Sequence, residues 1–126
     1  MHENEISERI IGAAIEVHRI LGPGLLEGVY EECLCHEFHL RGIRFERQKP
    51  VPIEYKAVKL STDLRLDLMV EDKVMVDVKA KEEMGDKDHA KTLTYLRLTN
   101  TRLGLNMNFH ELRLVDGIKR IVNNLE

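Results

Sequence analysis

The sequence predicts a small α/β or α+β fold in which helices pack against a sheet. Two segments with apolar residues at helical spacing come first, a run of alternating apolar residues follows, and a third helical segment precedes a returning strand. The chain has 126 residues, of which 43% are hydrophobic and 33% are charged. This length and composition predict a single domain over residues 1–126 with a core of its own.

The N-terminal part of the chain predicts two helices. Apolar residues recur at helical spacing from Ile6 to Leu21 and predict a helix over residues 5–21. The sequence Gly-Pro-Gly at residues 22–24 interrupts this helix. The segment LLEGVYEECLCHEFHLR then resumes the helical period until Gly42, so a second helix is expected there.

The remaining elements follow from the same patterns. Residues 43–60 favour extended structure, but two prolines limit ladder pairing and indicate an edge or irregular strand. Residues 64–83 predict a hairpin, and residues 86–100 predict a third helix. A strand is expected around residues 103–109, and a shorter strand or a helix near residues 118–124.

The register of the hairpin follows from its alternating residues. Each strand is predicted to have one apolar face, and both faces are expected to turn to the core. The shortest loop that allows this is Glu71–Lys73, which places Val70 opposite Val74. The alternating apolar residues are Leu64, Leu66, Leu68 and Val70 in the first strand, and Val74, Val76, Val78 and Ala80 in the second.

This register places like charges opposite each other. Asp67 is expected to face Asp77, and Arg65 to face Lys79, at a cost of roughly 0.2–1 kcal/mol per pair. One explanation is a lattice of diagonal ion pairs, from Asp67 to Lys79 and from Arg65 to Asp77. The other explanation is a divalent cation held by two carboxylates about 5 Å apart. Magnesium suits such a site, and a lysine two residues after an acid can stabilise developing phosphate charge.

Several ordered motifs are similar to one protein family. Residues 24–30, GLLEGVY, match the pattern GxxExxY. Asp67 followed by Asp77-Val78-Lys79 looks like the spaced acid and (D/E)xK elements of PD-(D/E)XK nucleases. Together these features resemble the GxxExxY protein family within the PD-(D/E)XK nuclease superfamily. The likeness also includes Phe45–Gln48, Pro50–Pro52, His89, Tyr95 and Asn108–Phe109.

The resemblance implies a fold, a cofactor and a set of catalytic residues. The implied fold is a restriction-endonuclease-like core, a mixed β-sheet flanked by helices. The implied cofactor is Mg²⁺, with Mn²⁺ as a substitute, held by Asp67 and Asp77, and Glu27 completes the acidic cluster. Lys79 is implied as the catalytic lysine. The activity expected is hydrolysis of phosphodiester bonds of DNA or RNA by a metal-activated water.

Four further residues are expected to support the site or to bind substrate. Tyr30 and Tyr95 are expected to pack their rings and to place a hydrogen-bonded hydroxyl near the site. His89 lies at the start of the third helix. Its side chain could either cap the helix or contact a phosphate. Lys91 stands four residues before Tyr95, where the superfamily often has glutamine. It can meet a phosphate as a point charge, but it cannot accept a hydrogen bond as glutamine does.

Two other functions stay open beside the nuclease. Lys91 and the pI near 6.1 are compatible with a catalytically weak or inactive module of the same fold, one that binds nucleic acid or a protein. Two carboxylates at this spacing also occur in retaining glycosidases. A glycosidase, however, needs no lysine beside its acid.

Composition also bounds location and partners. The sequence contains no apolar run near 18 residues, so no membrane span is expected. The polar start MHENEISERI lacks the apolar region of a signal peptide. A cytoplasmic protein is therefore expected. The net charge of −3 gives no overall basic footprint. A homodimer, with one site in each subunit, could cut both strands of a duplex. Local phosphate contacts could come from the basic residues Arg41, Arg44, Arg47, Lys49, Lys56 and Lys59.

Overall fold

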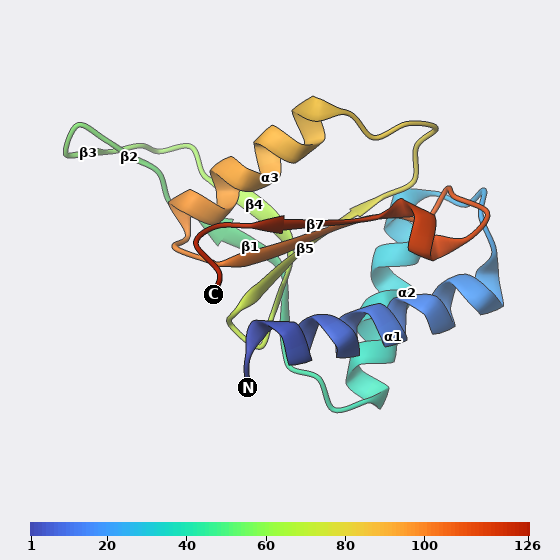
Figure 1. Cartoon of the computed structure of the whole chain (residues 1–126). Coiled ribbons are helices and arrows are strands. Elements are labelled where there is room, and N and C mark those ends of the chain that lie inside the picture. The colour runs from blue at the N-terminus through green and yellow to red at the C-terminus, as the bar shows by residue number, and fades with distance from the viewer.

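Two helices, α1 (Glu3–Leu21) and α2 (Glu27–Leu40), form the first layer of the computed structural model, which describes residues 1–126 (Figure 1). α1 begins two residues earlier than predicted, because Nδ1 of His2 accepts the backbone N–H of Asn4 and caps the helix. α2 begins two residues later than the apolar period indicates. Shifts of this size at helix ends are ordinary.

A five-stranded sheet lies beside these helices, and its strand order is β1-β4-β5-β6-β7. β5 and β6 are parallel, while the other neighbouring strands are antiparallel. Helix α3 (Asp86–Leu98) makes the crossover that a parallel pair requires. The mixed sheet flanked by helices is therefore confirmed. The strands are β1 (Phe45–Val51), β4 (Leu64–Val70), β5 (Val74–Lys79), β6 (Leu103–Asn108) and β7 (Ile118–Val122).

Helices cover both faces of the sheet. α1 and α2 pack on one face and α3 on the other, as Figure 1 shows. The larger core has 20 buried residues and includes Ile10 of α1, Phe38 of α2 and Val76 of β5. The smaller core has 6 buried residues and includes Leu96 of α3 and Met75 of β5. The central strand β5 is therefore buried from both sides.

The less regular segments resolve into short elements. β1 is an edge strand, as its proline predicts, but residues 43–60 do not form one strand. They also contain most of a separate two-stranded hairpin, which the sequence pattern did not reveal. Residues 118–124 form mainly a strand, β7, because they pair with β6. The short elements are β2 (Glu54–Tyr55), β3 (Val58–Lys59) and the 3₁₀ helix η1 (Leu114–Gly117).

The predicted hairpin register holds only near the turn. Val70 pairs with Val74, and the ladder continues to the pair of Leu68 and Val76, where it ends. The predicted pairing of Arg65 with Lys79 is wrong, because β4 parts from β5 beyond Leu68 and stays paired with β1 on its other side.

The single apolar face predicted for the first strand of the hairpin is also wrong. Leu68 and Val70 belong to the core under α1 and α2, whereas Leu66 belongs to the core under α3, with Leu64 packed against it. Residues two apart in a regular strand share a face. The side chains therefore change faces at Asp67, which lies between Leu66 and Leu68.

The neighbouring strand β1 is irregular at the corresponding position. Arg47 pairs with Leu68 and Lys49 pairs with Leu66, but Gln48 and Asp67 between them do not pair. Gln48 has a φ of 53°, which is uncommon for a residue other than glycine. Asp67 itself thus has no ladder partner in either neighbouring strand.

Candidate active site

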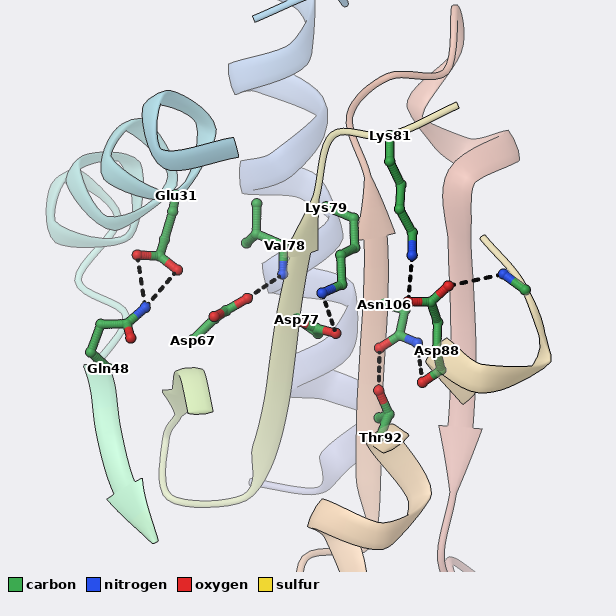
Figure 2. A network of polar contacts seen from close by, with 11 residues as sticks. Glu31, Gln48, Asp67, Asp77, Val78, Lys79, Lys81, Asp88, Thr92 and Asn106 are labelled. Atoms are coloured by element: carbon green, nitrogen blue, oxygen red, sulfur yellow. Dashed lines mark hydrogen bonds and ion pairs between the residues drawn. The ribbon is translucent and has the colours of Figure 1, made fainter. Parts of the chain in front are cut away.

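Asp67 lies where β4 and β5 separate, and its side chain takes over a backbone role there. Its Oδ2 accepts the backbone N–H of Val78 at 2.9 Å, as Figure 2 shows. A side-chain acceptor thus replaces a ladder acceptor, which a buried N–H requires. This bond holds the Asp67 carboxylate against β5.

Asp77 and Lys79 form an ion pair on β5. Nζ of Lys79 lies 3.5 Å from Oδ2 of Asp77, and their side chains are 17% and 8% exposed. The lattice of diagonal ion pairs suggested by the sequence is not present. Arg65 instead donates from Nη1 to the carbonyl oxygen of Gln48. Cross-strand ion pairs therefore do not explain why two aspartates are placed here.

A cavity of about 150 Å³ brings residues of four elements together. It lies at the place where β4 and β5 part, so both helix layers contribute to its lining. The predicted site residues that line it are Glu27 of α2, Asp67 of β4, Asp77 and Lys79 of β5, and Lys91 and Tyr95 of α3. The other lining residues are Arg65, Leu66, Met75 and Thr92.

The electrostatics of the cavity are those of a crowded acidic site. Burial raises the pKa of Asp67 to about 6, and the nearby Asp77 carboxylate adds to this rise. Partial burial also raises the pKa of Glu27, against the opposing charge of Lys79. Burial lowers the pKa of Lys79, but the Asp77 carboxylate and the other acids outweigh it, so this pKa is raised above its usual value. Lys79 is therefore a charged ammonium at neutral pH, suited to stabilise negative charge.

The donor set of this cavity fits a divalent cation. No group of three or more His, Cys, Asp or Glu side chains is gathered closely enough to hold a metal ion as the side chains stand. Asp67 and Asp77 nevertheless lie close enough for one to raise the pKa of the other. Mg²⁺ is often held by one or two carboxylates, with water completing its shell. These two aspartates offer that arrangement, and Glu27 lines the same cavity.

Two of the expected supporting residues lie outside the cavity. Tyr30 is fully buried, and its ring stacks on Phe109 with 4.7 Å between the ring centroids. Its hydroxyl donates to the carbonyl oxygen of Gly22 at 2.6 Å and accepts the N–H of Leu25 at 3.1 Å. His89 is exposed on α3 and lines a separate depression. The structure thus gives Tyr30 a structural position, beneath the loop that leads to Glu27.

The Tyr30→Phe substitution is expected to lower stability. Two hydrogen bonds of the hydroxyl are lost, so the free energy of unfolding should fall by about 1–2 kcal/mol. Chemical denaturation measures this loss. Mg²⁺ affinity, measured by calorimetry, should change less than threefold, and a loss of binding in a folded Tyr30→Phe protein would contradict the structural role.

A buried polar cluster beside the site was not found from the sequence. Glu31 of α2 is 6% exposed and accepts a hydrogen bond from Nε of Arg47 at 2.8 Å. It also accepts one from Nε2 of Gln48 at 3.1 Å, which Figure 2 shows. It therefore ties α2 to β1 at the residue beside Asp67. The available signal is that Leu34 and other apolar residues follow Glu31 at helical spacing, which places this acid on the buried face.

A second group fixes α3 on the sheet. Oγ1 of Thr92 donates to Oδ1 of Asn106 at 2.7 Å, and both residues are buried (Figure 2). Gly104 permits the close approach, because a Cβ there would lie 3.0 Å from Cγ2 of Thr92. These contacts hold the helix that carries Lys91 and Tyr95. The two asparagines in the buried strand LGLNMN are the sequence signal for such a polar group.

The fold and this site define an α/β protein with two carboxylates and a lysine in one cavity of a mixed sheet. The family model of the PD-(D/E)XK nuclease superfamily matches residues 4–121. The chain therefore belongs to the PD-(D/E)XK nuclease superfamily, and its fold agrees with a restriction-endonuclease-like core. No curated protein and no solved structure matches the chain.

Membership of this superfamily indicates a nuclease-type function. Its nucleases generally use divalent metals, and the superfamily implies binding to nucleic acid. None of the helices is both long and apolar enough to cross a membrane.

Proposed function

We propose that this protein is a Mg²⁺-dependent nuclease that hydrolyses phosphodiester bonds of DNA or RNA in the cavity between β4 and β5. The observation that supports this best is the meeting of Asp67, Asp77 and the charged Lys79 in one cavity of a superfamily member. Residues 24–30 support a finer assignment to the GxxExxY family, because Glu27 of that motif lines the same cavity.

Each residue has a proposed role. Asp67 and Asp77 hold the cation, with Glu27 as a further carboxylate on the rim, and Mn²⁺ is expected to substitute for Mg²⁺. The bound cation supplies Lewis-acid activation of water and of the phosphate. Lys79 positions the attacking water and stabilises charge on the phosphate oxygens.

Lys91 and Tyr95 form the α3 side of the proposed site. Nζ of Lys91 lies 5.5 Å from the centroid of the Tyr95 ring, and both residues line the cavity. In this proposal the ammonium meets a phosphate as a point charge, and the ring orients it. His89 lies outside the cavity and is proposed to contact the backbone of a longer substrate.

A cleavage panel tests the proposal. The purified protein is incubated with single- and double-stranded DNA and RNA in Mg²⁺, in Mn²⁺ and in EDTA. Cleavage is expected only with a metal. Calorimetric Mg²⁺ titrations of Asp67→Ala and Asp77→Ala are expected to show loss of binding. Absence of cleavage across all substrates, with Mg²⁺ bound by the unsubstituted protein, would favour the alternative of a catalytically inactive binding module.

A further inference from the structure

A two-stranded hairpin projects from the end of the sheet. β2 and β3 form this hairpin, which we call the arm and define as residues 52–63. The arm belongs to no other sheet and extends away from the helices in Figure 1. Its side chains form no core, since Tyr55 is 61% exposed and Val58 is 60% exposed. An arm of this kind adds little to the stability of the domain.

The tip of the arm has an unfavourable turn sequence. Lys56 and Ala57 both have positive φ angles, of 49° and 68°. Two-residue turns of this shape favour Asn-Gly, because residues with a Cβ are strained in the left-handed region. The lysine at the tip is thus not explained by the folding of the hairpin.

The side chains of the arm combine an aromatic ring with two lysines. Nζ of Lys56 lies 5.4 Å from the centroid of the Tyr55 ring. Neither Lys56 nor Lys59 forms an ion pair with a carboxylate, although Glu54 is the ladder partner of Lys59. An exposed ring for base stacking beside unpaired cations is the arrangement that binds single-stranded nucleic acid.

The arm is continuous with the candidate active site. It joins β1 to β4 at the end where Val51 pairs with Leu64 and Pro50 pairs with Arg65. Arg65 lines the cavity and adds a cation between the arm and Asp67. Lys59 is eight residues from Asp67, so the two lie at most about 26 Å apart at 3.3 Å per residue. A stacked strand covers this distance in about eight nucleotides.

We propose that the arm binds a single-stranded segment of the nucleic acid whose phosphodiester bond occupies the cavity. Tyr55 stacks on a base, and Lys56 and Lys59 contact phosphates. This inference rests on the proposed nuclease function and names the substrate form that the site takes. A protein partner that adds a strand to the arm is the competing occupant, but it would leave the two unpaired lysines without a role.

The test measures binding separately from cleavage. All proteins carry Asp77→Asn to prevent hydrolysis, and the affinity for a labelled single strand of about 20 nucleotides is measured by fluorescence anisotropy over a range of salt. Tyr55→Ala is expected to weaken binding about 5-fold or more. This factor corresponds to the lower end of the free energies found for a base stacked on an aromatic ring. Tyr55→Phe keeps the stacking face and should bind as the parent does.

A paired substitution at the tip separates binding from folding. The Lys56→Asn, Ala57→Gly protein has a better turn sequence, so it should melt at the same or a higher temperature. It should nevertheless bind more weakly and lose about one unit of salt slope. Lys73→Gln, in the exposed turn between β4 and β5, is the matched control and should leave affinity unchanged. A strand of about four nucleotides should bind all variants alike, because it cannot reach from the cavity to the arm.

The outcomes distinguish this proposal from the nuclease function. Equal affinity of the parent, Tyr55→Ala and tip variants for the long strand would overturn the role of the arm, even if the unsubstituted protein cleaves nucleic acid. The role of the arm would also be overturned if the arm variants bound the four-nucleotide strand as much more weakly as they bind the long strand. The substitutions would then act on binding in the cavity. Weaker binding by the arm variants without metal-dependent cleavage by the unsubstituted protein would support the arm and reject the nuclease.

Discussion

Replacing Lys79 with alanine or glutamine is expected to reduce cleavage at least about 100-fold, as occurs when one donor to developing charge is removed. Lys79 is a charged ammonium that lies 3.5 Å from Asp77, and the acids of the cavity raise its pKa. It cannot act as a general base at neutral pH. Its proposed contribution is electrostatic, so the loss should appear in kcat as well as in kcat/KM.

The Mg²⁺ affinity of the Lys79 variants separates catalysis from folding. Removing a cation beside the metal site should leave this affinity unchanged or increase it. Lys79→Gln retains a donor for the buried Asp77 and controls for the partner lost in Lys79→Ala. Lys73→Ala, at the exposed turn of the same hairpin, should cleave at the normal rate. Normal cleavage by a folded Lys79→Gln protein would reject the mechanism.

The Asp67→Asn substitution is expected to have opposite effects on metal binding and on stability. Mg²⁺ affinity should fall at least about 10-fold, because substitution of a group that only contacts a metal ligand already lowers metal affinity by this factor. The metal-free protein should become more stable at pH 8 by roughly 1–2 kcal/mol, a value discounted for partial solvent screening. Asparagine keeps an acceptor for the N–H of Val78 while it removes the charge repelled by Asp77.

The stability gained by Asp67→Asn should depend on pH, and the pKa of Asp67 gives the direction of this dependence. The pKa of Asp67 rises from 3.8 in the unfolded chain to about 6 in the folded protein. Between these values the folded state binds more protons than the unfolded state, so its stability falls as the pH rises through this window. The stability gained by Asp67→Asn should therefore be small near pH 3.5 and increase until about pH 7.

Denaturation of the metal-free proteins at several pH values measures this difference. Asp63→Asn, an exposed acid just before β4, is the matched control and should show no such trend. Excess Mg²⁺ should stabilise the unsubstituted protein and not Asp67→Asn, because only the former binds the ion well. The quantity to compare is the stability of Asp67→Asn minus that of the unsubstituted protein. A smaller difference at pH 8 than at pH 3.5 would contradict this account.

The aspartates show where reasoning from the sequence succeeds and where it fails. Alternating apolar residues correctly fix the turn and the pair of Val70 and Val74, because local periodicity and turn length determine register there. The same alternation wrongly places Leu66 and Leu68 on one face. The change of face at Asp67 depends on β1, where Gln48 has a left-handed backbone and a hydrogen bond to Glu31. No local pattern within the hairpin contains that information.

The candidate site follows the same division. Motif order selects Glu27, Asp67, Asp77 and Lys79, and the structure places all four in one cavity. It separates Tyr30 from them, because Tyr30 faces the core beneath α1 and α2 rather than the opening between β4 and β5. The motif alone does not predict this separation, because residues three apart in a helix are neighbours on its surface.

The sequence by itself therefore determined the helices, a sheet packed against them, the turn of the hairpin and the residue types that the chemistry requires. These depend on hydrophobic periods and spacings within short segments. Only the tertiary structure decided that β4 parts from β5 at Asp67, that Lys79 pairs with Asp77 rather than across the hairpin, and that β2 and β3 project as an arm. The first of these depends on contacts with β1, which is distant from β4 in the chain, and there packing and burial outweigh local preference.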